Sequence, residues 1–391
     1  MAQPRGWVLP VIVFSQFTGT SLWFAGNAVA EDLRQAWFLP EGVVGHITSS
    51  VQFGFIVGTL VFAFFALSDR ISPRLLFFGC SILGGLANGA ILFSPPGLIQ
   101  LVVLRFMTGF FLAGIYPVGM KIAASWYAQD LGRAIGFLVG ALVLGTAFPH
   151  LVKSWGTALP WQTVMLTLTV TAVLGGTLLL ILVPDGPHLP KSPAAFQPRA
   201  LLAMFRDRDF RAASFGYFGH MWELYAFWAF LPFFLGLYHS RVSPLTDLSL
   251  WSFALIAVGF FGCAFGGILS RRHGSARVAQ VQLVISGLCC LLSPLSLQLP
   301  KPAFLLFMTL WGVTVIGDSP QFSALTARTA PRDRVGSALT MVTCIGFSIT
   351  ILSIQLLNTL SGLARPEFLF LALAPGPLFG TWSTLRLVGR M

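Results

Sequence analysis

Residues 42–93 read GVVGHITSSVQFGFIVGTLVFAFFAL, then SDRISPR, then LLFFGCSILGGLANGAILF. Two long apolar runs therefore flank one short polar segment. A hydrocarbon core of about 30 Å needs roughly 20 helical residues, because each residue advances about 1.5 Å along the helix axis. Runs of this length without strand-like alternation predict membrane-spanning helices, since in lipid every backbone amide must pair within the protein.

The same pattern recurs along the whole chain of 391 residues, of which only 9% are charged. The predicted fold class is an all-α membrane protein with twelve transmembrane helices. The first apolar run is too long for a signal-peptide core and no small-x-small site closes it, so we expect it to remain as the first helix. The predicted spans are 7–30, 42–67, 75–93, 98–120, 132–151, 161–183, 210–238, 250–269, 277–297, 303–326, 334–357 and 366–388.

Basic residues indicate the orientation of these helices. Most of the 24 Lys and Arg residues fall in the segments on the side that carries both chain ends. By the positive-inside rule both termini are cytoplasmic, as an even number of spans requires. We therefore interpret the net charge of +11 as a topological signal in an integral protein of the cytoplasmic membrane, and expect no nucleic-acid partner.

The helices divide six and six around a Pro-rich, basic segment. We predict an N-terminal half at 1–183, a cytoplasmic linker at 184–209 and a C-terminal half at 210–391. The halves echo one another, as repeats in secondary transporters do. Gly109…Gly114-Ile115-Tyr116-Pro117 recurs as Gly312…Gly317-Asp318-Ser319-Pro320, and the polar segment 68–74 has its counterpart in Ser270-Arg271-Arg272-His273-Gly274-Ser275-Ala276-Arg277. These echoes predict pseudo-symmetry between the two halves.

At these motifs the chain resembles the major facilitator superfamily over its whole length. Asp69-Arg70-x-x-x-Arg74 resembles the family's loop signature, although Phe65 and Ser72 stand where the family usually has glycine and Pro73 where it has a base. The resemblance implies transport by alternating access, a monomer, and gating contacts at the cytoplasmic helix ends. The gating residues we expect are Asp69, Arg70, Arg74, Arg133, Arg271 and Arg272.

Arg105-x-x-x-Gly109-x-x-x-Ala113 resembles the family's fourth-helix signature, whose arginine is associated with proton coupling or substrate contact. Ionisable groups inside spans are costly in any family, so each one is a functional hypothesis. His220 and Glu223 lie three residues apart on one face of the seventh helix, and Asp318 lies in the tenth with Gln321 one turn further on.

We predict that these residues bind substrate or protons. The alternatives are that Arg105 ties its helix to a neighbouring backbone carbonyl, that Glu223 is permanently paired, and that Asp318 forms a salt bridge to Arg105 or Lys121.

A polar stripe along the first helix and several aromatic residues complete the predicted site. The stripe comprises Gln16, Thr20, Trp23, Asn27 and Glu31 at helical spacing, which predicts a face toward a cavity rather than lipid. From it we assign Trp23 and Asn27 to the site, together with Tyr116 and Tyr225. All five cysteines fall within spans without metal-ligand spacing, so we expect packing roles, no metal and no cofactor.

This mixture of one cation, two acids and aromatic rings favours a small organic acid or zwitterion, moved by proton-coupled transport. Its carboxylate is expected to pair with Arg105 and its amine to meet Glu223. A multidrug or cation exporter is one alternative, because acids beside aromatic rings also suit lipophilic cations.

An inorganic-anion porter is another alternative. The stretch from Trp126-Tyr127 to Gly132-Arg133 resembles nitrate/nitrite and cyanate permeases, but the second and eighth helices carry no arginine to hold such an anion. A membrane-embedded enzyme is remote, since the sequence has no His-Glu-x-x-His, Gly-x-Ser-x-Gly or phosphate-loop motif.

Overall fold

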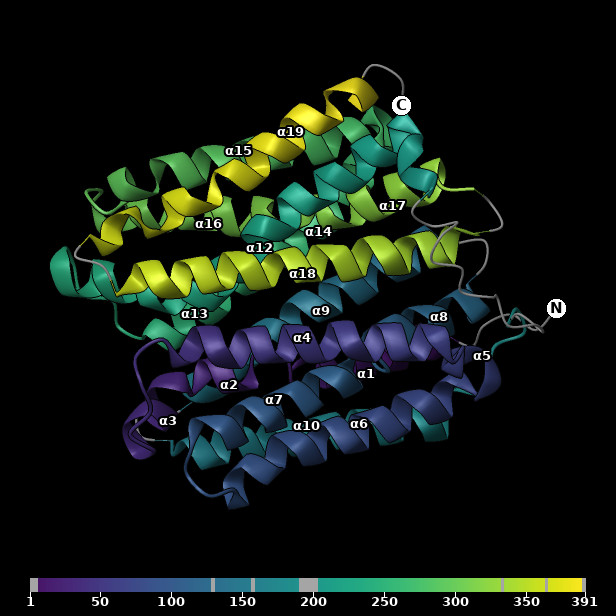
Figure 1. Cartoon of the computed structure of the whole chain (residues 1–391), viewed down its shortest axis with the longest axis horizontal. Helices are drawn as coiled ribbons and strands as arrows, with labels where there is room; N and C mark the ends of the chain where they lie inside the picture. The colour runs from purple at the N-terminus through teal and green to yellow at the C-terminus, as the bar shows by residue number, and fades with distance from the viewer. Residues whose placement is uncertain are drawn as a thin grey trace. The chain divides into compact units, whose positions relative to one another are not determined.

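The computed structural model describes residues 6–127, 131–155, 159–189, 203–331, 334–362 and 365–388, with the side chains of 131–133 excepted. Within these ranges the chain is almost entirely helical and contains no strand (Figure 1). It divides into two compact units, Met1–Phe196 and Gln197–Met391. Residues 190–202 of the predicted linker lie outside the described ranges.

The first unit contains ten helices and one 3-10 turn in the described part of the chain. They are α1 (Val8–Thr20), α2 (Ala25–Ala28), α3 (Ala30–Ala36), α4 (Val43–Phe64), α5 (Leu67–Arg70), α6 (Pro73–Gly89), η1 (Ala90–Phe93), α7 (Leu98–Leu112), α8 (Tyr116–Trp126), α9 (Leu131–Ser154) and α10 (Trp161–Leu182).

The second unit is built in the same way. Its described elements are η2 (Met204–Arg206), α12 (Arg208–Arg241), α13 (Leu248–Ala257), α14 (Gly259–His273), α15 (Ser275–Ser296), α16 (Lys301–Gly317), α17 (Ser319–Thr329), α18 (Val335–Ser361), η4 (Pro366–Leu373) and α19 (Pro375–Val388).

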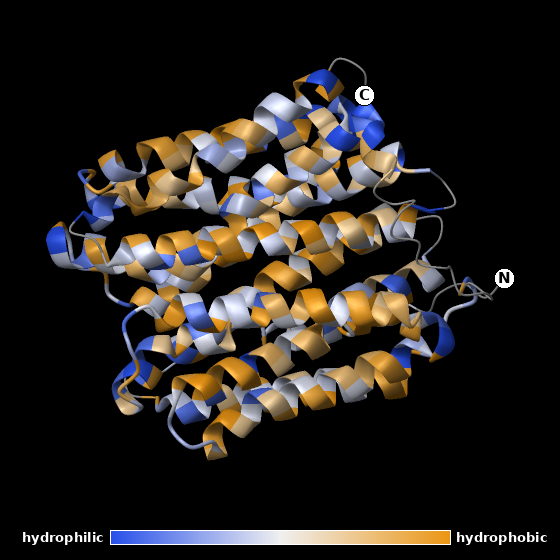
Figure 2. Cartoon of the chain, in the orientation of Figure 1, coloured by the Kyte–Doolittle hydropathy of each residue, from blue (hydrophilic) through white to orange (hydrophobic). Residues whose placement is uncertain are grey.

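Eleven helical segments are long and apolar enough to cross a membrane, and Val8–Thr20 is a twelfth, shorter apolar helix. Apolar residues run along the middle of the helices, while polar residues gather at their ends (Figure 2). The predicted fold class is therefore confirmed, with span boundaries that agree to within a few residues.

The first predicted span departs from the prediction of one continuous helix over 7–30. Helix α1 ends at Thr20, four turn residues follow, and α2 begins only at Ala25. A further interruption at Val29 separates α2 from α3. The prediction was wrong here because the apolar run continues without Gly or Pro through the first break, so composition gives no sign of it.

The fourth and tenth spans are also broken, and at equivalent places. Helices α7 and α8 are separated by residues 113–115, and α16 and α17 by Asp318 alone. Pro117 and Pro320 each stand at the second position of the following helix, where a missing amide hydrogen is tolerated. The internal sequence echo thus corresponds to a repeated structural feature inside each unit.

Close helix packing explains the glycines in this echo. A Cβ atom at Gly109 would collide with the carbonyl oxygen of Val51 on α4, and one at Gly312 would collide with that of Leu255 on α13. Small residues at such positions let membrane helices approach backbone to backbone. The two glycines therefore fix the broken spans against their neighbours.

Candidate functional site

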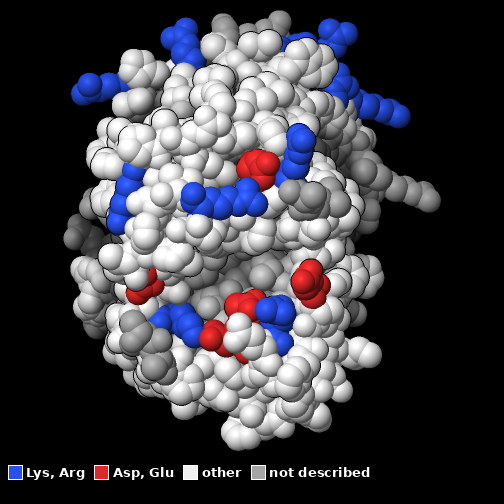
Figure 3. All heavy atoms as spheres, turned by 90° about the vertical axis from the view of Figure 1, so that its left-hand side faces the viewer, with Lys and Arg blue, Asp and Glu red and all other residues white. Residues whose placement is uncertain are grey.

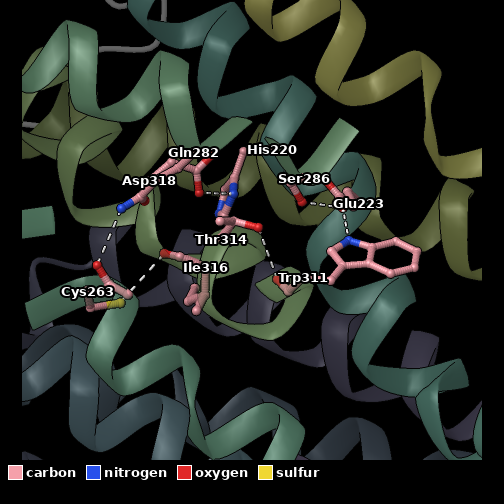
Figure 4. Close-up of polar contacts among 10 residues, drawn as sticks. His220, Glu223, Cys263, Gln282, Ser286, Trp311, Thr314, Ile316 and Asp318 are labelled. Carbon is pink, nitrogen blue, oxygen red and sulfur yellow. Dashed lines mark hydrogen bonds and ion pairs between the residues drawn. The ribbon is translucent and has the colours of Figure 1, made fainter. Parts of the chain in front are cut away.

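A buried histidine–aspartate pair lies inside the second unit. His220 Nδ1 on α12 is 2.8 Å from Asp318 Oδ1, and both side chains are only 1% exposed (Figure 4). The imidazole ring lies between Tyr217 and Phe322, with ring centroids 5.9 and 6.2 Å away. Its second nitrogen, Nε2, is buried and has no hydrogen-bond partner.

Asp318 occupies the break between α16 and α17, next to the N-terminal end of α17. The positive end of that helix dipole is a favourable place for a carboxylate. The neighbouring carbonyl of Ile316 accepts a hydrogen bond from the Cys263 thiol at 3.6 Å. Gln282 of α15 packs against Gly317 and donates to the Gly262 carbonyl at 3.5 Å. The break is therefore lined with polar groups from three other helices.

Glu223 engages a separate set of partners one turn along α12. Its Oε1 accepts hydrogen bonds from Ser286 Oγ at 2.5 Å, Trp311 Nε1 at 2.6 Å and Cys290 Sγ at 3.3 Å. All three donors converge on one oxygen of the carboxyl group. His220 and Glu223 share a helix but contact different side chains (Figure 4).

Arg105 is buried in the first unit and is held by neutral acceptors. One terminal nitrogen of the guanidinium, Nη1, donates to Asn88 Oδ1 at 2.8 Å. The other, Nη2, donates to the carbonyl oxygens of Leu22 and Trp23 at 2.7 and 2.8 Å, respectively. The side chain is fully buried. This is the arrangement of the alternative hypothesis, in which the arginine ties its helix to a neighbour through backbone carbonyls.

The described contacts of Asp318, Arg105 and Lys121 are all formed with groups of their own unit. Asp318 contacts His220, Arg105 bonds to Asn88 and two carbonyls, and Lys121 forms an ion pair with Asp69. Each of these contacts lies within a single unit, and a pairing of Asp318 with Arg105 or Lys121 stays a hypothesis.

The remaining predicted site residues are dispersed over several helices. Trp23 is fully buried in the break of the first span, with its ring 4.8 Å from that of Phe55. Asn27 donates to Thr48 Oγ1 at 2.7 Å. Tyr116 is half-buried at the start of α8. Trp23 and Asn27 therefore face α4 rather than standing free.

In the second unit, Tyr225 is buried with its ring 5.4 Å from that of Trp228 and 5.1 Å from that of Phe347. Gln321 is buried on the first turn of α17, close to Gly266. Only Gln321 among these lies beside the break that holds Asp318.

Two of the expected gating residues take part in ion pairs at one end of the first unit. Asp69 pairs with Lys121, which also donates to the Ser68 carbonyl. Arg74 lies 3.8 Å from Asp185, whose carboxylate accepts hydrogen bonds from Ser72 at 2.7 and 2.8 Å. The first pair joins α5 to the middle of α8, and the second joins the start of α6 to the chain after α10.

Of the other expected gating residues, Arg70, Arg271 and Arg272 form no ion pair with another described residue. All three are exposed, and the side chain of Arg133 lies outside the described residues. The beginning of the predicted linker packs on the first unit, since Trp126 Nε1 donates to the Pro184 carbonyl at 3.0 Å.

Ion pairs also occur within each unit among other charged side chains, and Figure 3 shows acidic and basic side chains next to one another at the end of the first unit that carries α3. Lys153 contacts Asp32 at 2.7 Å in the first unit, and Arg241 contacts Glu367 at 3.0 Å in the second. A hydrogen bond from Arg34 holds the pKa of Glu31 below its usual value.

Sequence reasoning missed Asn88, Ser286 and the role of Cys290. Ser286 and Cys290 are four residues apart on α15 and so share one face. That spacing of two small polar side chains in an apolar span was the available signal. Asn88 is a single amide in an apolar run, which is the same kind of signal in weaker form.

The sequence matches the family model described as Major Facilitator Superfamily over residues 8–354. The chain belongs to the Major Facilitator Superfamily. It is therefore a transporter and not an enzyme, as predicted: a secondary transporter that works by alternating access, binds a small molecule and lies in a lipid bilayer.

Solved structures of other facilitators are similar to this one. A bacterial homolog of the human lysosomal transporter Spinster, in an inward-facing and unoccupied conformation, is 15% identical, with a TM-score of 0.71 over 99% of this chain and 96% of that one. The xylose transporter XylE from E. coli is 13% identical, with a TM-score of 0.73 over 96% and 97%.

The nucleoside transporter NupG is 11% identical, with a TM-score of 0.71 over 97% of this facilitator and 99% of that chain. Identities this low establish a shared fold. No curated protein matches the sequence.

Proposed function

We propose that this facilitator moves a small organic acid or zwitterion across the membrane and couples that movement to protons. Membership of the superfamily accounts for transport as such. The substrate class and the coupling ion are the proposal.

The observation that carries the proposal is the distribution of buried charge. In the first unit the described contacts of Arg105 include no carboxylate. The second unit buries Glu223 and Asp318 with one histidine. Buried charge without a counter-ion is costly, so a ligand of opposite charge is stabilised near it. A carboxylate group offsets a charge such as that of Arg105, and an amine offsets charges such as those of Glu223 and Asp318, so a solute with one or both groups fits the chemistry of these residues.

The described geometry also changes how Arg105 is expected to act. Its terminal nitrogens donate to Asn88 and to the carbonyls of Leu22 and Trp23, its Nε has no hydrogen-bond partner among the described residues, and the whole side chain is buried away from solvent. We therefore propose that the arginine attracts a carboxylate through its positive charge rather than through direct hydrogen bonds.

Two features support proton coupling. In the tautomer of His220 that donates Nδ1–H to Asp318, Nε2 remains an open acceptor, and a proton bound there produces an imidazolium beside a carboxylate. Glu223 is the second feature, a buried acid whose Oε1 accepts all three described hydrogen bonds. Buried acids and histidines of this kind form proton relays in membrane transporters.

Reconstituted vesicles containing a pH-sensitive dye test the proposal. We expect at least one of L-alanine, pyruvate and succinate to move protons with it, and His220→Asn and Glu223→Gln to reduce that movement by about tenfold or more. His273→Asn, at the exposed end of α14, is the matched control and should leave it unchanged. The proposal fails if none of the three solutes moves protons.

A multidrug or cation exporter is favoured by one observation. Trp311 packs in a tilted arrangement against Phe227 and edge-on against Phe370, at ring-centroid distances of 4.5 and 5.3 Å, and it donates a hydrogen bond to Glu223. Aromatic faces next to an acid suit lipophilic cations. Cells that express such an exporter survive ethidium and tetraphenylphosphonium, whereas a porter for organic acids gives no protection. Nitrate and cyanate uptake tests the inorganic-anion alternative in the same vesicles.

A further inference from the structure

The break in the first span interrupts the hydrogen bonding of the helix backbone. Residues 21–24 leave the helix, so the carbonyls of Leu22 and Trp23 lie outside regular helical pairing. In a membrane an unpaired backbone carbonyl is costly, and broken helices persist only where other groups in the protein satisfy them. Some group must therefore replace the missing helical bonds.

The Arg105 guanidinium is that group. Its terminal nitrogen Nη2 donates to both carbonyl oxygens, at 2.7 Å to that of Leu22 and 2.8 Å to that of Trp23. A planar fork of several donors can bind two carbonyls and a third acceptor together, which an ammonium group does less well. The side chain is fully buried, and its Nε, which packs against Gly26, has no hydrogen-bond partner among the described residues.

Asn88 fixes the guanidinium from the other side. Its Oδ1 accepts a hydrogen bond from Arg105 Nη1 at 2.8 Å. Its Nδ2 donates to Thr169 Oγ1 at 3.0 Å and to the Met165 carbonyl oxygen at 3.3 Å. A continuous chain of hydrogen bonds thus runs from α10 through α6 and α7 to the break. The amide is oriented by α10 and in turn orients the arginine.

The surroundings explain how a cation is tolerated there. The guanidinium contacts the carbonyl end of α1, which carries the negative end of the helix dipole and offsets a positive charge. Gly26 completes the fit, because a Cβ atom at that position would lie 3.2 Å from Arg105 Nε. The break and the arginine are therefore closely matched in charge and shape.

We propose that Arg105 is a positioning residue, which holds the break of the first span in place of helical hydrogen bonds, and that Asn88 sets its orientation. The break contains Trp23 and is followed by Asn27, whose side chain bonds to Thr48. Arg105 acts on the solute through these residues and does not donate a hydrogen bond to it. This functional part rests on the proposed function, whereas the effect on the backbone does not.

Hydrogen exchange of the full-length protein in lipid nanodiscs tests the backbone effect. We expect Asn88→Leu and Arg105→Lys to speed amide exchange in peptides covering residues 17–28 by about tenfold. Asn88→Asp keeps an acceptor for the guanidinium and should restore slow exchange. Thr169→Val removes a partner of Asn88 but not of Arg105, so exchange should change by less than about threefold. Asn88→Ser replaces Asn88→Leu if the latter does not fold.

Transport kinetics separate positioning from direct contact. With whichever of L-alanine, pyruvate or succinate is carried, Asn88→Leu should raise KM more than it lowers the maximal rate, and Asn88→Asp should restore KM.

Two results would overturn the inference. The first is that both Asn88→Leu and Arg105→Lys leave amide exchange in residues 17–28 within about twofold of the native protein. The second is that Arg105→Lys raises KM while exchange stays slow, since that pattern means direct contact. Faster exchange with no transport of any probe refutes the proposed substrate class alone.

Discussion

Two serines on α15 provide a controlled test of the Glu223 network. Ser286 and Ser293 are buried to 1% and 0% exposure, respectively, on the same helix. Ser286 Oγ donates to Glu223 Oε1 at 2.5 Å, whereas Ser293 Oγ donates to the Cys290 carbonyl of its own helix at 2.8 Å. Replacing each by alanine removes one hydroxyl group in the same setting, so only the lost partner differs.

The expected difference follows from these partners. A hydrogen bond to a charged group contributes about 1.5–3 kcal/mol, and a hydroxyl that returns to its own helix contributes little. Both substitutions gain up to about 0.5 kcal/mol of helix propensity, which cancels in the comparison. We expect Ser286→Ala to be less stable than Ser293→Ala by about 2 kcal/mol, a roughly thirtyfold difference in the unfolding equilibrium.

Reversible unfolding in mixed micelles of mild detergent and dodecyl sulfate measures this difference. Glu223→Gln keeps an acceptor oxygen but removes the charge, so in that background the cost of Ser286→Ala should fall to about 1 kcal/mol. Equal stability of the two alanine variants would refute the reasoning, because it would mean that the Ser286 bond contributes nothing. An unchanged cost in the Glu223→Gln background would show that the acceptor is not a charged carboxylate.

Three other outcomes are expected. Gly109→Ala should destabilise the protein by more than about 2 kcal/mol in the mixed-micelle unfolding assay, because the new Cβ atom would collide with the backbone of α4. Gly79→Ala is the control: the space around Gly79 is open, so this substitution should stabilise the protein by about 0.5–1 kcal/mol. Lys121→Met should cost about 1 kcal/mol through loss of the Asp69 pair, and this cost should shrink when thermal unfolding is repeated at about 1 M salt. The lowered pKa of Glu31 means that its pair with Arg34 stabilises the fold above about pH 4.5 and that this contribution is lost as the pH falls further. The difference in unfolding free energy between the native protein and Glu31→Gln should be a few tenths of a kcal/mol at neutral pH and should shrink as unfolding is measured at pH values progressively below 4.5.

The helices and the family were predictable because length and hydropathy dominate the energy of a span. The apolar runs gave most boundaries within a few residues, but the spans 98–120 and 303–326 were predicted as continuous although Pro117 and Pro320 stand just after their breaks. The break at residues 21–24 was not predictable, since what stabilises it is Arg105, distant in sequence. Local composition carries no information about a hydrogen bond formed across some 80 residues.

The partners within the candidate site were less predictable for the same reason. Helical spacing placed His220 and Glu223 on one face of α12. Which neighbour each side chain meets depends on how the helices are rotated about their axes, and packing sets that rotation. Glu223 bonds to Ser286 and Trp311, which are 63 and 88 residues away in the sequence. Sequence reasoning therefore identified the chemistry of the site but not its pairing.

In each unit the partial charge at the end of a broken helix offsets the charge of a buried side chain, and these charges have opposite signs in the two units. In the first, the cation of Arg105 lies against the carbonyl end of the broken first span. In the second, the carboxylate of Asp318 lies at the amino end of α17. Each broken helix thus supplies a partial charge that offsets a buried ionic group. A helix that closed either break would remove that partial charge, so the breaks and the charged residues depend on one another and substitution of either should disturb both.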